Sequence, residues 1–123
     1  SSVVTDQAAN SGIYAEAAVS TVARVDVANT TLARNTRGVE LNATAGGTVL
    51  AGVVSNQIVE NTAAGVNVSG AGATARVSWN AVFRNPIGLN AVGGGTLFSP
   101  VTNYVRDNAT NSVPATPTAD ALL

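Results

Sequence analysis

An internal repeat of 23 to 27 residues constrains the fold of this chain more than any other feature of its sequence. Four hexapeptides have the form Asn-x-aliphatic-x-x-Asn, with Thr replacing the first Asn in one of them. Their last residues, at steps of 26, 24 and 23, are Asn35, Asn61, Asn85 and Asn108. Four segments of the form Gly-aliphatic-x-aliphatic recur at steps of 26, 27 and 23, starting at Gly12, Gly38, Gly65 and Gly88. Two independent markers with one period indicate stacked, structurally equivalent units.

Apolar and polar residues alternate in each Gly-led segment, which is the pattern of a short β-strand with one buried and one solvated face. The residues expected to face the core are Ile13, Val39, Val66 and Leu89. Second strands are expected around 25–27, 49–51, 75–77 and 97–101. Helix is disfavoured because Val, Thr, Asn and Gly dominate the sequence. We therefore expect an all-β chain in which three short strands close each coil.

The asparagines recur at the same position of every repeat. This recurrence favours a stack of coils over a β-sandwich, because a sandwich does not require one residue type at a fixed position of each repeat. Coils stack about 4.8 Å apart, so each Asn meets its copies above and below. Its amide can donate and accept along the stack and hold a left-handed turn. The first expected ladder is Asn35, Asn61, Asn85 and Asn108. The second is Thr30, Asn56, Asn80 and Asn103.

Two further columns follow from the same register. Aliphatic residues between the ladders should be buried above one another, namely Leu32, Ile58, Val82 and Val105. The residue before each Asn of the first ladder alternates in charge along the stack, in the order Arg34, Glu60, Arg84 and Asp107. This alternation places unlike charges on successive coils, which favours cross-coil ion pairs.

These motifs, between residues 10 and 108, resemble the right-handed parallel β-helix repeat family, the architecture of pectate lyases, polygalacturonases, phage tailspikes and many bacterial surface proteins. The resemblance implies a right-handed parallel β-helix, or β-solenoid, of about four coils with three short strands per coil. A leucine-rich repeat also carries an asparagine ladder at a similar period, but this chain lacks the dense Leu framework of that fold.

The two ends of the chain are expected to differ. Coils are expected over residues 1–108 and a terminating or capping tail over residues 109–123. Pro114 and Pro117 cannot extend a strand ladder, and the closing Ala121-Leu122-Leu123 is apolar enough to cover the end of the core. The first coil has no such cap, and Val3-Val4-Thr5 has the pattern of an open edge strand, so we expect self-association through this coil. Alternatively, the chain is a piece of a longer array.

Composition argues against several kinds of chemistry. The chain has no Cys and no His, so a thiol nucleophile, an imidazole base and a conventional zinc or haem site are not expected. Charged residues are 11% of the chain, against a usual value of about 25%. With six basic residues and a net charge of -1, there is no basic stripe for nucleic acid. The longest apolar run, at 49–54, is too short for membrane insertion. We expect no catalytic residue, metal or cofactor.

The resemblance also implies a groove along the outer face of one sheet, where acidic residues of the family's enzymes bind calcium or act as acids and a Lys or Arg acts as base. The candidate groove consists of Tyr14, Glu16, Arg37, Glu40, Asn42, Asn67 and Asn90. A working carboxylate pair needs one desolvated partner, which an open strand on a solvated face does not provide for Glu16 or Glu40. Arg37 stays protonated and is expected to pair with an acid.

The sequence therefore predicts a non-catalytic structural or surface-presentation module, secreted or at the cell envelope of a bacterium. One alternative is a carbohydrate-binding module on the outer face of the Gly-led sheet, with a polysaccharide as partner. Another is a partial or degenerate polysaccharide lyase or hydrolase. Trp79, Phe83 and Tyr104 allow two interpretations, because aromatic rings can stack on a sugar or simply cover the corners of coils.

Overall fold

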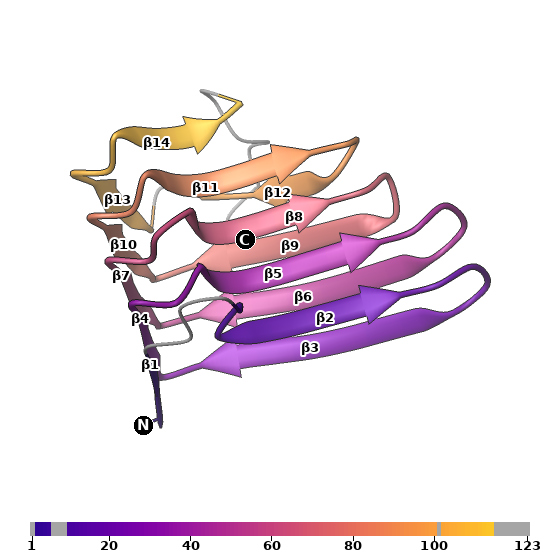
Figure 1. The fold of residues 1–123 in the computed structure, drawn as a ribbon, viewed down its shortest axis with the longest axis horizontal. Coiled ribbons are helices and arrows are strands. Elements are labelled where there is room, and N and C mark those ends of the chain that lie inside the picture. The colour runs from indigo at the N-terminus through magenta and orange to yellow at the C-terminus, as the bar shows by residue number, and fades with distance from the viewer. Residues whose placement is uncertain (1, 6–9, 101, 115–123) are drawn as a thin grey trace.

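The computed structural model describes residues 2–5, 10–100 and 102–114. Over these residues the chain forms fourteen β-strands and no helix. Successive strands visit three parallel sheets in turn, so that three strands close one coil. Four complete coils and the first two strands of a fifth stack into a right-handed β-solenoid (Figure 1). The expected all-β fold with three strands per coil is confirmed.

The three sheets run along the whole stack. Sheet A, at the left of Figure 1, contains β1 (Ser2–Thr5), β4 (Thr30–Ala33), β7 (Gln57–Val59), β10 (Ala81–Phe83) and β13 (Tyr104–Arg106). Sheet B faces the viewer and contains β2 (Ile13–Ala17), β5 (Arg37–Ala43), β8 (Ala64–Ser69), β11 (Ile87–Val92) and β14 (Thr110–Val113). Sheet C lies behind it and contains β3 (Val22–Ala28), β6 (Thr48–Val54), β9 (Ala73–Ser78) and β12 (Thr96–Phe98).

Aliphatic side chains from the three sheets fill the interior in columns. In sheet A, Ile58 pairs with Leu32 on one side and with Val82 on the other, and none of the three is more than 1% exposed. Val105 continues this column and is partly buried. The expected column of sheet B is also in register, through Ile13, Val39, Val66 and Leu89. The buried core cluster consists of Val, Ala, Leu and Ile alone.

Two asparagine ladders run along the solenoid, one at each end of the sheet A strands. Asn61 illustrates the bonding, since its Oδ1 accepts from the backbone N–H of Asn35 at 3.1 Å. Its Nδ2 donates to Oδ1 of Asn85 at 3.0 Å and to the carbonyl of Leu32 at 3.2 Å. Such bonds connect the first ladder, Asn35, Asn61, Asn85 and Asn108. They also connect the second, Thr30, Asn56, Asn80 and Asn103.

A left-handed residue precedes every ladder position except Asn103. Before the second ladder, φ is 53° at Asn29, 59° at Ser55 and 58° at Trp79. Before the first ladder, φ lies between 55° and 58° at Arg34, Glu60, Arg84 and Asp107. The expectation that the asparagines themselves hold this conformation is therefore wrong. A left-handed residue bends the chain at the corner, and the Asn that follows is then free to turn its amide into the stack.

The alternating charged column forms at least one cross-coil ion pair. Arg84 Nε lies 3.8 Å from Glu60 Oε2, and the two side chains are 58% and 49% exposed. The Arg84 guanidinium also lies over the ring of Phe83, at 4.6 Å from its centroid. Because both charges face solvent, this pair stabilises the fold by at most about 1 kcal/mol. The ladders and the aliphatic columns therefore dominate the stability of the stack.

The glycines that lead the sheet B strands leave space for the first ladder. A Cβ at Gly65 would lie 2.6 Å from the carbonyl oxygen of Gly88 and 3.2 Å from Nδ2 of Asn85. A Cβ at Gly38 would lie 2.7 Å from the carbonyl oxygen of Gly65 and 3.2 Å from Nδ2 of Asn61. The repeated Gly therefore reflects close approach between coils, and this explains why the Gly and Asn markers share one period.

We expect Gly65→Ala to lower the free energy of unfolding by about 1–3 kcal/mol, the usual cost of overpacking, because the backbone of the next coil blocks the added methyl group. The matched control is Gly52→Ala in β6, where the added Cβ meets only the carboxylate of Asp26, at 2.8 Å. That side chain can move away. Urea denaturation should therefore show a loss for Gly65→Ala alone, and equal effects of the two substitutions would contradict this account.

The ends of the stack differ from the coils between them. Beyond residue 108, β14 adds a further strand to sheet B. The first ladder ends at Asn108, whose Nδ2 donates to Oδ1 of Asn111 at 3.1 Å. Asn111 thus replaces the partner that a further coil would supply. The expected fold-back of Ala121-Leu122-Leu123 and the predicted role of Pro117 lie outside the described residues.

The first coil presents an edge strand in sheet A. β1 pairs with β4, and Val3 on it is 68% exposed. An edge of this kind can pair with another chain. Self-association through the first coil stays a prediction, which sedimentation over a range of concentrations can test.

Candidate functional site

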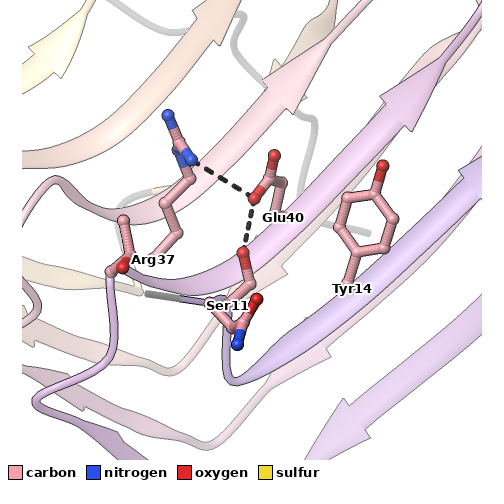
Figure 2. Close-up of a pocket in the computed structure, with 6 residues that line it drawn as sticks. Ser11, Tyr14, Arg37 and Glu40 are labelled. Atoms are coloured by element: carbon pink, nitrogen blue, oxygen red, sulfur yellow. Dashed lines mark hydrogen bonds and ion pairs between the residues drawn. The ribbon is translucent and has the colours of Figure 1, made fainter. Parts of the chain in front are cut away.

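The outer face of sheet B carries a polar hollow of about 280 Å³ at the first two coils. Its lining residues are Asn10, Ser11, Tyr14, Thr36, Arg37 and Glu40. Tyr14 on β2 and Glu40 on β5 are register partners, so their side chains lie side by side on the outer face (Figure 2). Arg37 is the first residue of β5, and Ser11 lies just before β2. The alternation that turns Ile13 and Val39 toward the core is what turns Tyr14 and Glu40 outward.

Glu40 is the centre of the hollow. Its Oε2 accepts hydrogen bonds from the Ser11 hydroxyl and from Arg37 Nη1, the latter at 3.4 Å (Figure 2). The Arg37 and Glu40 side chains are 37% and 20% exposed. Arg37 is therefore the partner of an acid, as expected. This arrangement holds one carboxylate in place, with its remaining surface open to solvent.

Tyr14 links the hollow to its neighbours on the same face. Its hydroxyl donates to Glu16 Oε2 at 2.8 Å and accepts from Asn42 Nδ2 at 3.5 Å. The Asn42 bond lowers the pKa of Tyr14, but the bond to Glu16, partial burial and the nearby charges of Glu16 and Glu40 outweigh it, so the pKa of Tyr14 is raised. The phenol therefore stays protonated at neutral pH, where it donates a hydrogen bond and cannot act as a base.

The other two predicted groove residues lie higher on the same column. Asn67 is the register partner of Glu40, and Asn90 is the register partner of Asn67. Asn90 Nδ2 donates to Asn67 Oδ1 at 2.7 Å, and Asn67 is only 7% exposed. The two amides are therefore bonded to each other and lie outside the lining of the hollow. They continue the polar column of sheet B along the stack.

The predicted groove residues thus share one polar face, but only some of them line the hollow. Tyr14, Arg37 and Glu40 line the hollow, while Glu16 and Asn42 adjoin it through Tyr14. Sequence reasoning did not include Asn10, Ser11 and Thr36, which also line it. No strong signal marks them in the sequence, because their position depends on the turns that connect sheet A to sheet B. The face offers donors and acceptors suited to hydroxyl groups of a ligand.

A second polar hollow, of about 440 Å³, lies on the outer face of sheet C and was not foreseen from the sequence. It lies over Gly52, between Asp26 on β3 and Arg76 on β9, which are its register neighbours. The Arg76 guanidinium stacks on Phe98, at 4.3 Å from the ring centroid. The lack of a side chain at position 52 opens this hollow, and the isolated Gly inside the strand was its only signal in the sequence.

Two further properties of the described part of the chain bear on the candidate chemistry. Across residues 2–5, 10–100 and 102–114, no group of three or more His, Cys, Asp or Glu side chains is placed to hold a metal ion. The same residues contain no helix with the length and apolar character needed to cross a membrane.

The fold and this polar face define a parallel β-solenoid of about four turns, built on internal asparagine ladders. No family model, curated protein or solved structure matched the chain when it was compared with them.

Proposed function

We propose that this chain is a non-catalytic β-solenoid module of the pectate-lyase-like, bacterial surface type, which presents its polar outer faces in a structural or surface role outside the cell. The observation that carries the proposal is that the buried polar side chains are bonded within the stack itself. The buried asparagines bond to one another along the stack, and no buried side-chain N or O atom of the described residues lacks a partner. Such a scaffold is rigid and presents a regular surface.

The polar hollow on sheet B also favours a non-catalytic role. Lyase and hydrolase chemistry on a polysaccharide needs a base or an acid that is desolvated and available to the substrate. Arg37 is held by Glu40, and the phenol of Tyr14 is bonded to Glu16. The acidic and basic groups of this face are therefore bonded to one another on an open surface.

An activity assay tests this proposal. The chain is incubated with polygalacturonate, and release of unsaturated products and of reducing ends is followed by ultraviolet absorbance and a reducing-sugar assay. We expect neither signal to rise above that of the buffer. A rate that depends on protein concentration and disappears in Glu40→Gln would contradict the proposal and would support the alternative of a polysaccharide lyase or hydrolase.

A second candidate function is carbohydrate binding at the sheet B hollow. It is favoured by Tyr14, a 51% exposed aromatic ring directly beside the carboxylate of Glu40. A sugar ring can stack on such a ring while its hydroxyl groups donate to a carboxylate. A glycan array should then report binding that is lost in Tyr14→Ala and kept in Val54→Ala, which removes an exposed side chain from sheet C. An array without any bound glycan would exclude this candidate.

A further inference from the structure

Trp79 occupies a backbone position that suits it poorly. Its φ of 58° is left-handed, a conformation that is unfavourable for a bulky side chain. The equivalent corner residues of the two preceding coils are Asn29 and Ser55, and Asn in particular tolerates this conformation. Trp79 is also 66% exposed, so the indole gains little from burial. The ladder imposes this turn but does not require an indole, because Asn29 and Ser55 make the same turn in the neighbouring coils.

The other aromatic residues near this sheet are already engaged. Phe83 and Tyr104 pack edge to face, with ring centroids 6.4 Å apart and planes at 80°. The guanidinium of Arg84 covers the Phe83 ring. The sequence allowed a platform of three aromatic residues, but Phe83 and Tyr104 form a pair of their own. Trp79 is thus the aromatic ring that remains open at its corner.

Trp79 lines a shallow hollow of about 500 Å³ on the corner between sheets C and A. Exposed or partly exposed polar side chains surround it, namely Asn29, Thr31, Ser55 and Gln57. All eight lining residues are uncharged. Beneath them, the second ladder fixes the backbone, with Asn56 Nδ2 donating to Asn80 Oδ1 at 3.1 Å. The corner is therefore a rigid surface with one flat apolar ring and several neutral donors and acceptors.

We propose that this corner binds a neutral glycan, with a pyranose ring stacked on the indole of Trp79 and sugar hydroxyls bonded to Gln57, Thr31 and Ser55. The lack of charge in the lining favours a neutral ligand over a uronate or a phosphate. A flat ring suits the apolar face of a sugar, and amide and hydroxyl groups suit its equatorial hydroxyls. This site is separate from the sheet B hollow and does not depend on it.

Trp79 is the sole tryptophan of the chain, so its fluorescence reports directly on this site. The chain is titrated with cellohexaose, xylohexaose, mannohexaose and chitohexaose. We expect a saturable change in emission with at least one of them, with a dissociation constant of about 1 mM or below, as is reasonable for an open site. No change in emission with any of the four sugars would overturn the proposal.

Variants separate binding from folding. Trp79→Asn should abolish binding measured by calorimetry, while its melting temperature rises by a few degrees because Asn tolerates the left-handed turn. Gln57→Ala should weaken binding several-fold with the melting temperature unchanged. Tyr14→Ala, on sheet B, should leave the Trp79 titration unaltered. Binding that survives Trp79→Asn, or that is lost in Tyr14→Ala, would overturn the assignment to this corner, and the latter result would support the sheet B candidate.

Discussion

Truncation of Ile58 to Ala is expected to lower the free energy of unfolding by about 2–5 kcal/mol, the range for removing a large aliphatic side chain from a core. Ile58 is fully buried on β7, between Leu32 and Val82 of the adjacent coils. The effect should lie in the upper part of this range, because the ladders on both sides of sheet A hold the coils at a fixed spacing. The cavity therefore cannot collapse easily.

Urea denaturation followed by circular dichroism measures this loss. The matched control is Gln57→Ala, which truncates the exposed neighbour of Ile58 on the same strand and should change the unfolding free energy by less than about 0.5 kcal/mol. A loss below about 1 kcal/mol in Ile58→Ala would show that residue 58 is not enclosed by the stack.

Removal of one ladder amide is expected to have a similarly large effect. Asn61→Ala removes the acceptor of the Asn35 backbone N–H and the side-chain donor to the Leu32 carbonyl. A buried polar group that loses its partner costs about 1–3 kcal/mol, so the combined loss should be about 3 kcal/mol. Asn61 is 2% exposed in the intact chain, so its bonding partners are shielded from bulk solvent.

Thr62→Ala is the control for Asn61→Ala, since Thr62 is the next residue, is exposed and uses its backbone N–H to bond the carbonyl of Asn35. The unfolding free energy of this control should stay within about 0.5 kcal/mol of the unmodified chain. Asn61→Asp should be at least as damaging as Asn61→Ala at neutral pH, because it buries a carboxylate against two acceptors, the Leu32 carbonyl and Asn85 Oδ1. Equal stability of Asn61→Ala and Thr62→Ala would contradict the ladder.

The sequence predicts which residues stack on one another, because this stacking depends on the spacing of the repeats along the chain. Asn35, Asn61 and Asn85 recur at one phase, and any parallel stack that keeps their period brings them together. The alternation in the Gly-led strands fixes which residues face inward, such as Val39 and Val66. Both inferences need only spacing and the two-residue period of a strand.

Backbone conformation at the corners was not predictable in the same way. Spacing does not reveal the sign of φ, and Arg34 or Trp79 would not be chosen for a left-handed turn from residue preference. The ladder demands that turn one residue earlier than the Asn, and the tertiary arrangement overrides the local preference. This difference explains why the ladders were predicted and the conformation of their asparagines was not.

The sequence predicted only part of the candidate site, because only some of its residues follow the register of the repeat. Tyr14 and Glu40 meet because they share a register, which the repeat reveals. Ser11 reaches Glu40 from a turn whose path has no periodic signal. The exposed fraction of Asn67, only 7%, also depends on its neighbours on the outer face, which the repeat pattern does not describe. The sequence therefore predicted which residues pair in register, but not how far each side chain on the outer face is buried.

Hydrogen exchange of asparagine side-chain amides, measured by NMR, tests the stacked-ladder fold most directly. The ladder amides of Asn56, Asn61, Asn80 and Asn85 are buried and bonded on both sides, so their protons should exchange orders of magnitude more slowly than those of the exposed Asn29. Nuclear Overhauser contacts should also join Asn61 to Asn85 and Asn56 to Asn80. Uniformly fast exchange with no contact between these pairs would contradict the stacked coils.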